Sequence, residues 1–367
     1  MKNKLKLGII YGGRSGEHEV SLMSARSVLS VIDREKFEVV EIGLSRQGQW
    51  FIGDDLLNKL KDEDFADLTP AIFLPNPQNP GIYAREEGKI SLHSPLDVVF
   101  PVMHGTYSED GTLQGLFELA DIAYVGAGVL GSAACMDKGL FKDIMLANDI
   151  PVLPYKIFNR YMIENDIETC LDAAETIADF PLFTKPANLG SSVGISKCNN
   201  RSDLMEGLMY AAQYDRRIVI EKGINNAREI EISILGNEYP SASIPGEVVP
   251  KDIFYTYEEK YINDTAELLI PANISEEMIT QIQLLALKAY KATDCAGMGR
   301  VDFLIDPETG SLYLNEINTI PGFTKISMYP KLWEASDLPY SALIEKLIEL
   351  ALERKSQRDK TEREFRS

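Results

Sequence analysis

The sequence predicts a mixed α/β fold with a parallel sheet near the N-terminus. Strand-like and helix-like segments alternate along the 367 residues, which is typical of sheets covered by helices. A hydrophobic content of 45% is ordinary for a globular protein, and this length accommodates two or three compact domains. No apolar run is long enough to span a membrane, and no internal repeat is present.

We expect an N-terminal unit, residues 1–126, in which glycine-rich or polar segments follow the strands. Gly12–Glu19 and His104–Gly111 each follow a predicted strand, at the sheet edge where open α/β sheets bind ligands. The expected elements are a strand at Leu5–Tyr11, a helix from about His18, strands at Val39–Leu44 and Val98–Met103, a helix at Thr112–Leu119 and a short strand at Ala123–Val125.

We expect two further units, residues 127–224 and 225–367. The second would contain a helix at Asp137–Ala147, strands at Leu182–Lys185 and Val193–Lys197, a helix at Ser202–Tyr214 and a strand at Ile218–Glu221. The third would contain a strand at Glu229–Leu235, a loop over Val249–Ala266, a helix at Glu276–Lys291 and a strand hairpin. The mixed-charge segment Glu353–Ser367 follows an amphipathic pattern and is expected to fray at its end.

Composition limits the possible partners and the cellular compartment. Acidic residues outnumber basic ones 56 to 37, and the net charge of −19 predicts repulsion of nucleic acid and of anionic membranes. A phosphate ligand would therefore need a local basic pocket. The N-terminus enters its first strand without a signal-peptide pattern, so we expect a cytoplasmic protein. The four cysteines are scattered without a CxxC, which argues against a zinc module and favours reduced core thiols.

Two predicted strands near the C-terminus carry polar side chains where apolar ones are expected. The strands are Arg300–Leu304 and Leu314–Asn318, and Asp306–Gly310 between them has Pro and Gly at turn positions. If Ile305 pairs with Ser311, side-chain alternation places the polar groups of both strands on one face. These groups are Arg300, Asp302, Glu316 and Asn318.

Oxygen donors gathered in this way suit a hard cation such as Mg²⁺. The alternative is a solvated polar face. We favour the metal because the first strand continues into Phe303-Leu304-Ile305 and the second leads directly into Thr319-Ile320-Pro321-Gly322. Partly buried carboxylates without a partner cost several kcal/mol, roughly.

Two glycine-rich segments are candidate ligand loops. Gly126–Gly131 matches GxGxxG, but a helix and a proline turn follow where a βαβ unit is needed, so a turn between domains is the better interpretation. Lys185–Gly194 lies between two predicted strands and offers N–H and hydroxyl donors to phosphate. Its alternative is a plain flexible hairpin loop. Glu17 is suited to an ammonium group or, alternatively, to stabilising the N-terminus of a helix.

Taken together, the segments resemble the D-alanine:D-alanine ligase family of the ATP-grasp superfamily, over nearly the whole chain and in one order. The motifs are GGRSGEHEVS at 12–21, HGTYSEDGTLQG at 104–115, MDK at 136–138, KPANLGSSVG at 185–194, REIE at 228–231, FYTYEEKY at 254–261, GRVDF at 299–303 and NEINTIPGFT at 315–324. The resemblance implies an ATP-grasp fold behind an N-terminal Rossmann-like domain. It also implies ATP-dependent joining of two D-alanines through an acyl phosphate, for peptidoglycan synthesis, by a homodimer.

The resemblance further implies a nucleotide site with two magnesium ions, for which manganese can substitute. Lys138 and Lys185 would contact ATP phosphates. The adenine and ribose would be held by Glu221, Lys222, Ile224 and Glu229, and the site would also include Ser191, Ser192 and Asn315. Asp302, Glu316 and Asn318 would bind the metal ions.

The same resemblance implies the amino-acid sites. Glu17 would take the ammonium of the first D-alanine in a hydrogen-bonded set with Ser191 and Tyr261, with His104 nearby. Arg300 and the N–H of Gly322 would face the developing oxyanion, and Lys260 and Ser327 would bind the second carboxylate, in a pocket shaped by Met328. Tyr261 favours the dipeptide product. D-serine or D-lactate as the second substrate, and a non-catalytic nucleotide-binding protein, remain the alternatives.

Overall fold

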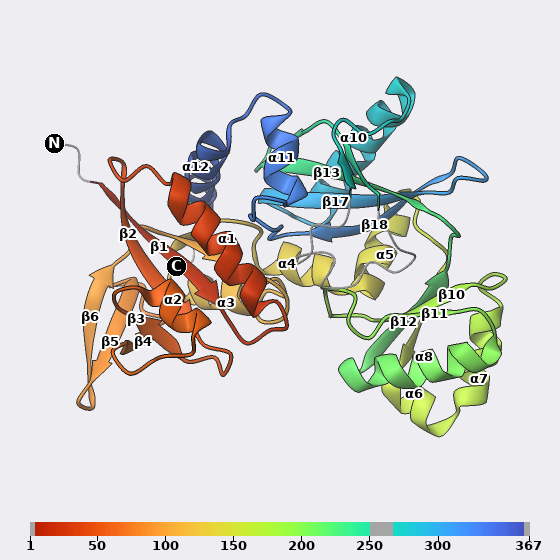
Figure 1. Ribbon diagram of the computed structural model, residues 1–367, viewed down its shortest axis with the longest axis horizontal. Coiled ribbons are helices and arrows are strands. Elements are labelled where there is room, and N and C mark those ends of the chain that lie inside the picture. The colour runs from red at the N-terminus through yellow and green to blue at the C-terminus, as the bar shows by residue number, and fades with distance from the viewer. Residues whose placement is uncertain (1–3, 250–266, 363–367) are drawn as a thin grey trace.

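The computed structural model describes residues 4–249 and 267–362, and their strands form three sheets (Figure 1). The first sheet lies at the N-terminal end of the molecule, and the other two lie side by side at the opposite end. The mixed α/β class predicted from the alternation of elements is confirmed. Within the described residues, no helix combines the length and the hydropathy needed to cross a bilayer.

The first sheet has eight strands in the order β6-β5-β4-β3-β2-β1-β7-β8. Its parallel half contains β1 (Leu5–Gly12), β2 (Phe37–Leu44), β7 (Val98–Val102) and β8 (Ala123–Tyr124), as predicted. Helices α1 (His18–Val31), α2 (Leu56–Lys61) and α3 (Thr112–Leu119) pack against this half. The sequence did not reveal its antiparallel extension, formed by β3 (Trp50–Ile52), β4 (Thr69–Phe73), β5 (Gly81–Glu86) and β6 (Lys89–Pro95). Strand β6 is mostly exposed, although Ile90 and Leu92 alternate with polar residues along it.

The second sheet has four strands in the order β11-β10-β12-β9. They are β9 (Tyr155–Asn159), β10 (Leu182–Pro186), β11 (Ser196–Cys198) and β12 (Arg217–Lys222). Helices α6 (Arg160–Asn165), α7 (Ile167–Glu175) and α8 (Arg201–Tyr214) cover one face. The strand predicted at Val193–Lys197 is displaced, because Gly190–Gly194 forms a turn and pairing begins at Ser196.

The third sheet has six strands around the central pair β13 (Arg228–Gly236) and β17 (Gly297–Ile305). The others are β14 (Ser241–Ala242), β15 (Gly246–Val249), β16 (Glu267–Leu269) and β18 (Leu312–Asn318). Helix α10 (Glu276–Ala292) packs against it, as do α4 (Val129–Met136) and α5 (Lys138–Ala147) through a shared core. Helix α4 starts inside the GxGxxG segment, so only Gly126–Gly128 is a turn.

The C-terminal helices connect the first and third sheets. Helix α11 is Met328–Glu334, and α12 is Tyr340–Arg358, which contacts β7 and β8 as well as β13 and β17. Helix α12 continues to Arg358, into the mixed-charge segment that begins at Glu353, and the end that was expected to fray lies outside the described residues. Arg358 forms ion pairs with Glu118 and Asp121 of the first unit, which hold the last turn of the helix.

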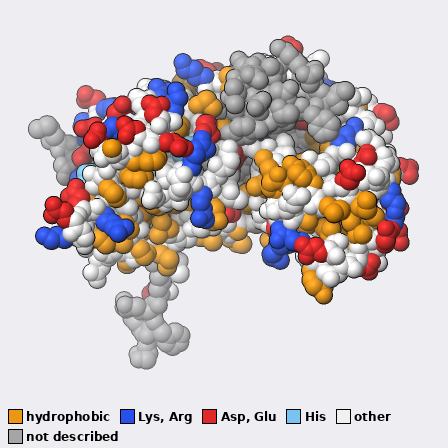
Figure 2. All heavy atoms as spheres, turned by 60° about the horizontal axis from the view of Figure 1, so that its bottom comes forward, with side chains coloured by type: hydrophobic (Ala, Val, Ile, Leu, Met, Phe, Trp, Pro, Cys, Tyr) orange, Lys and Arg blue, Asp and Glu red, His pale blue; other side chains and the backbone are white. Residues whose placement is uncertain are grey.

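The buried thiols follow the prediction, and the surface charge is mixed. On the face in Figure 2, acidic and basic side chains are interspersed, so the net negative charge does not form a single acidic patch there. All four cysteines are buried and none forms a disulfide.

Replacing Leu347 by alanine should destabilise the protein by about 2–5 kcal/mol, because this α12 side chain is 0% exposed in the core shared by the two sheets. Urea unfolding measures the change. Leu284→Ala is the control, since Leu284 on α10 is 64% exposed and should have little effect. Equal losses in the two variants would contradict the structural role of α12.

Candidate active site

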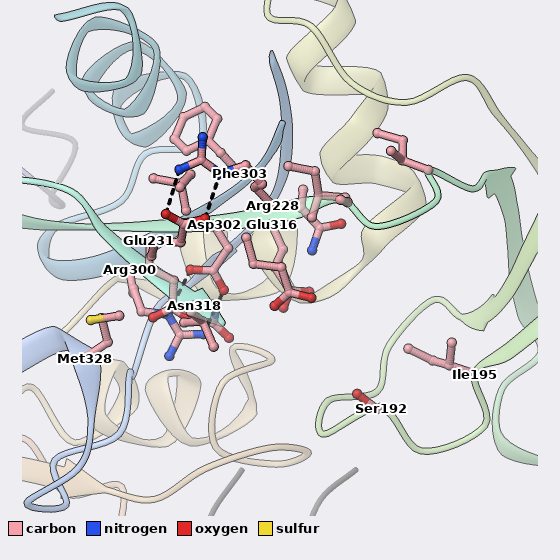
Figure 3. Close-up of a pocket in the computed structure, with 18 of the residues that line it drawn as sticks. Ser192, Ile195, Arg228, Glu231, Arg300, Asp302, Phe303, Glu316, Asn318 and Met328 are labelled. Atoms are coloured by element: carbon pink, nitrogen blue, oxygen red, sulfur yellow. Dashed lines mark hydrogen bonds and ion pairs between the residues drawn. The ribbon is translucent and has the colours of Figure 1, made fainter. Parts of the chain in front are cut away.

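A cavity of about 720 Å³ lies between the second and third sheets. Side chains from β10, β12, β13, β17 and β18 line it, together with the loop before β11 and the segment that leads into α11 (Figure 3). Most of the residues singled out in the sequence meet there. They are Lys138, Lys185, Ser192, Glu221, Lys222, Ile224, Glu229, Arg300, Asp302, Asn315, Glu316, Asn318, Gly322, Ser327 and Met328.

The register of the β17–β18 hairpin decides which side chains reach this cavity. The predicted pairing was wrong by one residue, because Ile305 pairs with Leu312 and not with Ser311. That shift alone would turn Glu316 away from Asp302. A β-bulge corrects it, since Phe303 pairs with Leu314 whereas Asp302 pairs with Glu316. The extra residue, Asn315, restores the shared face that the sequence predicted.

Arg300 is held by two carboxylates on this face. Its Nε and Nη2 donate to Oδ1 and Oδ2 of Asp302 over 2.8 and 2.7 Å, and its Nε lies 3.0 Å from Oε2 of Glu231 on β13. Asn318 donates from Nδ2 to Asp302 Oδ2 over 2.9 Å. The arrangement fixes the guanidinium beside the donor oxygens. Glu231 was not among the predicted residues, although it lies in the REIE segment.

The donor set fits a hard cation by its chemistry. Asp302, Glu316 and Asn318 contribute only oxygen ligands, and all three face one cavity. Among the described residues, no group of three or more His, Cys, Asp or Glu side chains is placed to hold a metal. The set at this cavity instead combines two carboxylates with one amide.

Lysines of α5 and β10 also line the cavity. Lys138 begins α5, and its Nζ donates to the carbonyl of Leu189 over 2.9 Å and lies 3.5 Å from Glu316 Oε2. Asp137 caps this helix by accepting from the N–H groups of Gly139 and Leu140. Asp137 also pairs with Arg217, which fixes the helix start against β12.

Glu221 of β12 lies between two lysines. Its Oε1 pairs with Lys185 of β10, and its Oε2 is 2.8 Å from Nζ of Lys142, one turn beyond Lys138 on α5. Burial alone would raise the pKa of the Glu221 carboxyl, but Lys142 and Lys185 together lower this pKa to about 2. Glu221 is therefore ionised at neutral pH.

A second cluster lies at the end of β1 and β7. Ser191 donates its hydroxyl to Oε1 of Glu17, which is 7% exposed, so this carboxylate touches the loop that lines the cavity. His104 contacts the carbonyl of Ile320 through Nδ1 at 3.0 Å and Ser24 through Nε2 at 3.1 Å. Burial lowers the pKa of His104 to about 4, so the imidazole is neutral at pH 7.

Comparison with known proteins identifies the family of this chain. The family model described as "D-ala D-ala ligase N-terminus" matches residues 6–127, and the one described as "D-ala D-ala ligase C-terminus" matches residues 144–349. This chain belongs to the D-alanine–D-alanine ligase family. Its structural neighbours are ligases of the same ATP-grasp family, which confirms the fold inferred from the motifs.

Relatives cover almost the whole chain. The D-alanine–D-alanine ligase of Heliobacterium modesticaldum is 47% identical over 363 residues, 98% of each chain. That of Thermoanaerobacter sp. is 49% identical over 352 residues, 95% of this chain and 97% of the relative. Among solved structures, VanG D-Ala:D-Ser ligase from Enterococcus faecalis has a TM-score of 0.84 at 35% identity and covers 95% of this chain and 100% of its own. The Coxiella burnetii D-alanine-D-alanine ligase has a TM-score of 0.81 at 35% identity over 97% and 96%.

Some expected residues are placed elsewhere. Glu17, His104 and Ser191 belong to the second cluster and do not line the cavity itself. Lys260, Tyr261 and the expected loop Phe254–Tyr261 lie outside the described residues. Ser327 Oγ accepts from the N–H of Thr324 at 2.9 Å, and a Cβ at Gly322 would lie only 2.7 Å from that Oγ. Position 322 therefore favours glycine.

Glu109 is a functional candidate that the sequence did not single out. Its Oε2 accepts from the N–H of Gly105 at 2.7 Å, and its Oε1 accepts from the N–H of Ile320 at 3.2 Å. Burial, and then the charge of Glu17, raise the pKa of Glu109 from 4.5 to about 8. Its place inside the HGTYSEDG segment was the available signal.

Replacing Glu109 by glutamine should change how stability depends on pH. The raised pKa means that the folded chain holds a proton which the unfolded chain releases between about pH 4.5 and pH 8. Stability from this carboxyl is therefore present at low pH and is lost as pH rises through 8. Relative to the wild type, the melting temperature of Glu109→Gln should increase from pH 5 to about pH 8 and then level off. Parallel melting curves at all pH values would contradict the raised pKa.

Proposed function

We propose that this chain is an ATP-dependent ligase that joins two D-alanine molecules into D-alanyl-D-alanine through an acyl phosphate. One observation carries the proposal. The oxygen donors of the β17–β18 hairpin and the lysines of α5 and β10 line one cavity, with Lys138 3.5 Å from Glu316, and the Glu17–Ser191 pair touches the loop that lines it. The cavity would thus hold the cations and the phosphates, and the ammonium partner would lie beside it. Membership of the ligase family supports the same activity.

The lysine side of the cavity would bind ATP. Lys138 and Lys185 carry the charge needed at the phosphates, and Ser192 lies in the loop whose N–H groups are suited to them. Glu221, Lys222, Ile224, Glu229 and Asn315 would form the remainder of the nucleotide site. Asp302, Glu316 and Asn318 would hold two Mg²⁺ ions, or Mn²⁺ in their place, which spread the charge of the transferring phosphoryl group.

The second cluster would bind the first D-alanine. Glu17 is an ionic partner for its ammonium, and Ser191 holds the Glu17 carboxylate in place. His104, neutral and fixed by Ser24 and Ile320, would lie beside the substrate. The substrate carboxylate, directed toward the cavity, would attack the γ-phosphorus of ATP to give an acyl phosphate and ADP.

The second D-alanine would enter beside Ser327 and Met328. Ser327, with Lys260, would hold its carboxylate, and its amine, after losing a proton, would attack the acyl carbonyl. The resulting tetrahedral oxyanion would face Arg300 and the N–H of Gly322, and one such donor is typically worth roughly 3–4 kcal/mol. Collapse of this intermediate expels phosphate and leaves the peptide bond. Tyr261 and its loop would exclude water while the acyl phosphate is present.

The proposal extends to organisation and setting. We propose domains at residues 1–126, 127–224 and 225–367, each built around one of the three sheets. The dipeptide would serve peptidoglycan precursor synthesis in the cytoplasm, by a homodimer. A D-Ala:D-Ser ligase is the second candidate, favoured by the similarity to VanG over nearly the full length.

Purified protein with ATP, Mg²⁺ and D-alanine alone should release ADP and form D-alanyl-D-alanine. The same assay with L-alanine should give no product, and D-alanine with D-serine or D-lactate tests the alternatives. Coupled ADP release and mass spectrometry of the product measure the outcome. Turnover only with an added second substrate would refute dipeptide formation and favour a D-serine or D-lactate ligase.

Replacing Glu316 by alanine should reduce turnover by at least about a thousandfold while leaving the fold intact, because it removes one of two carboxylates at the proposed cation site. Coupled ADP release gives the rate, and circular dichroism checks the fold. Glu308→Ala is the matched control, because Glu308 is exposed in the turn of the same hairpin and should retain normal turnover. Normal turnover by Glu316→Ala would refute the assignment of Glu316 as a metal ligand.

A further inference from the structure

Lys142 is a buried cation to which the proposed mechanism gives no task. Its side chain is 2% exposed, and it does not line the cavity, in contrast to Lys138 one turn earlier on the same helix. Helix α5 packs closely on the second sheet, since a Cβ at Gly139 would lie 2.6 Å from Ile157 of β9. A buried lysine is costly unless it is paired, so its position requires a reason.

The partner of Lys142 is Glu221. The carboxylate of Glu221 presents Oε2 to Lys142 at 2.8 Å, behind the cavity, and Oε1 to Lys185, which lines the cavity. Lys142 also lies 5.5 Å from the ring centre of Tyr155, on the strand next to β12. Lys142, Glu221 and Lys185 form a row of cation, anion and cation with a net charge of +1. Of the two cations, only Lys185 lines the cavity.

The second cation changes what Lys185 can do. Without Lys142, Glu221 and Lys185 would be a neutral buried pair, and movement of Lys185 to a phosphate would leave the carboxylate buried without a partner. With Lys142 in place, Glu221 keeps a counter-ion when Lys185 turns to an anion in the cavity. The cost of separating a buried ion pair is therefore avoided.

We propose that Lys142 is a positioning residue of the nucleotide site, which neutralises Glu221 and so makes the charge of Lys185 available to the phosphates. This role rests on the proposed ATP site. Lys142 acts through Glu221 and does not itself touch the nucleotide. The positive charge that the cavity offers to phosphate is then set from behind the sheet, by a residue outside the cavity wall.

Titration calorimetry with ADP and with inorganic tripolyphosphate tests the proposal, because tripolyphosphate reports on the phosphate contacts without the base. Lys142→Met should weaken binding of both by at least about tenfold. The double variant Lys142→Met with Glu221→Gln removes the stranded carboxylate and should bind tripolyphosphate within about fivefold of the wild type. Lys156→Met is the control, since Lys156 on β9 donates to Ala173 and Thr176 away from the cavity and should not affect binding.

The possible outcomes are distinct. Wild-type-like binding by a folded Lys142→Met refutes the role of Lys142 and leaves the nucleotide site standing. If that variant does not fold, the double variant decides, and a loss of tripolyphosphate binding beyond about tenfold in it refutes the role. If Lys142 had only a structural role, the double variant would bind tripolyphosphate no more tightly than Lys142→Met. Absence of ADP binding by the wild type would overturn the proposed ATP site itself, and this role with it.

Discussion

One extra residue in β18 controls the chemistry of the cavity. Side chains alternate along a strand, so Glu316 and Asn318 can share a face with Asp302 only if the hairpin register has the right parity. The pairs next to the turn, such as Ile305 with Leu312, would by themselves place Glu316 on the opposite face from Asp302. The bulge at Asn315 corrects this. The core side is preserved at the same time, because Leu312 and Leu314 before the bulge and Ile317 after it are all buried. The bulge therefore separates a polar cluster from an intact hydrophobic layer.

Local electrostatics explain how an acidic protein can provide a phosphate site. The chain carries a net charge of −19, yet Lys138 and Lys185 reach the cavity from elements that fix them in place. Asp137 caps the helix that begins at Lys138, and Glu221 anchors Lys185. Two carboxylates of the cavity are balanced by Arg300, which pairs with Asp302 and Glu231. Each of these charges thus has a partner that also orients it.

The sequence predicted those parts of the molecule that depend on local pattern. The parallel strands β1, β2 and β7 carry continuous apolar runs, and the polar hairpin stood out because its residues break the strand pattern. The antiparallel extension was not predicted because β3 has only three residues and β6 is mostly exposed, so neither carries the apolar run of β1 or β7. The register of β17 and β18 was also beyond local pattern, since a bulge is fixed by packing on both faces. Lys142 gave no signal because its importance depends on a partner far away in the sequence, and Glu231 was marked only as part of the REIE segment because its partner lies on a neighbouring strand.

A crystal structure of the protein with ADP and magnesium tests the central claim most directly. The account predicts oxygen atoms of Asp302, Glu316 and Asn318 at about 2.0–2.1 Å from bound Mg²⁺. It also predicts that the β17–β18 bulge is retained, with the nucleotide phosphates directed toward Lys138 and Lys185. Magnesium bound by other residues, or these three side chains turned away from an empty cavity, would contradict it.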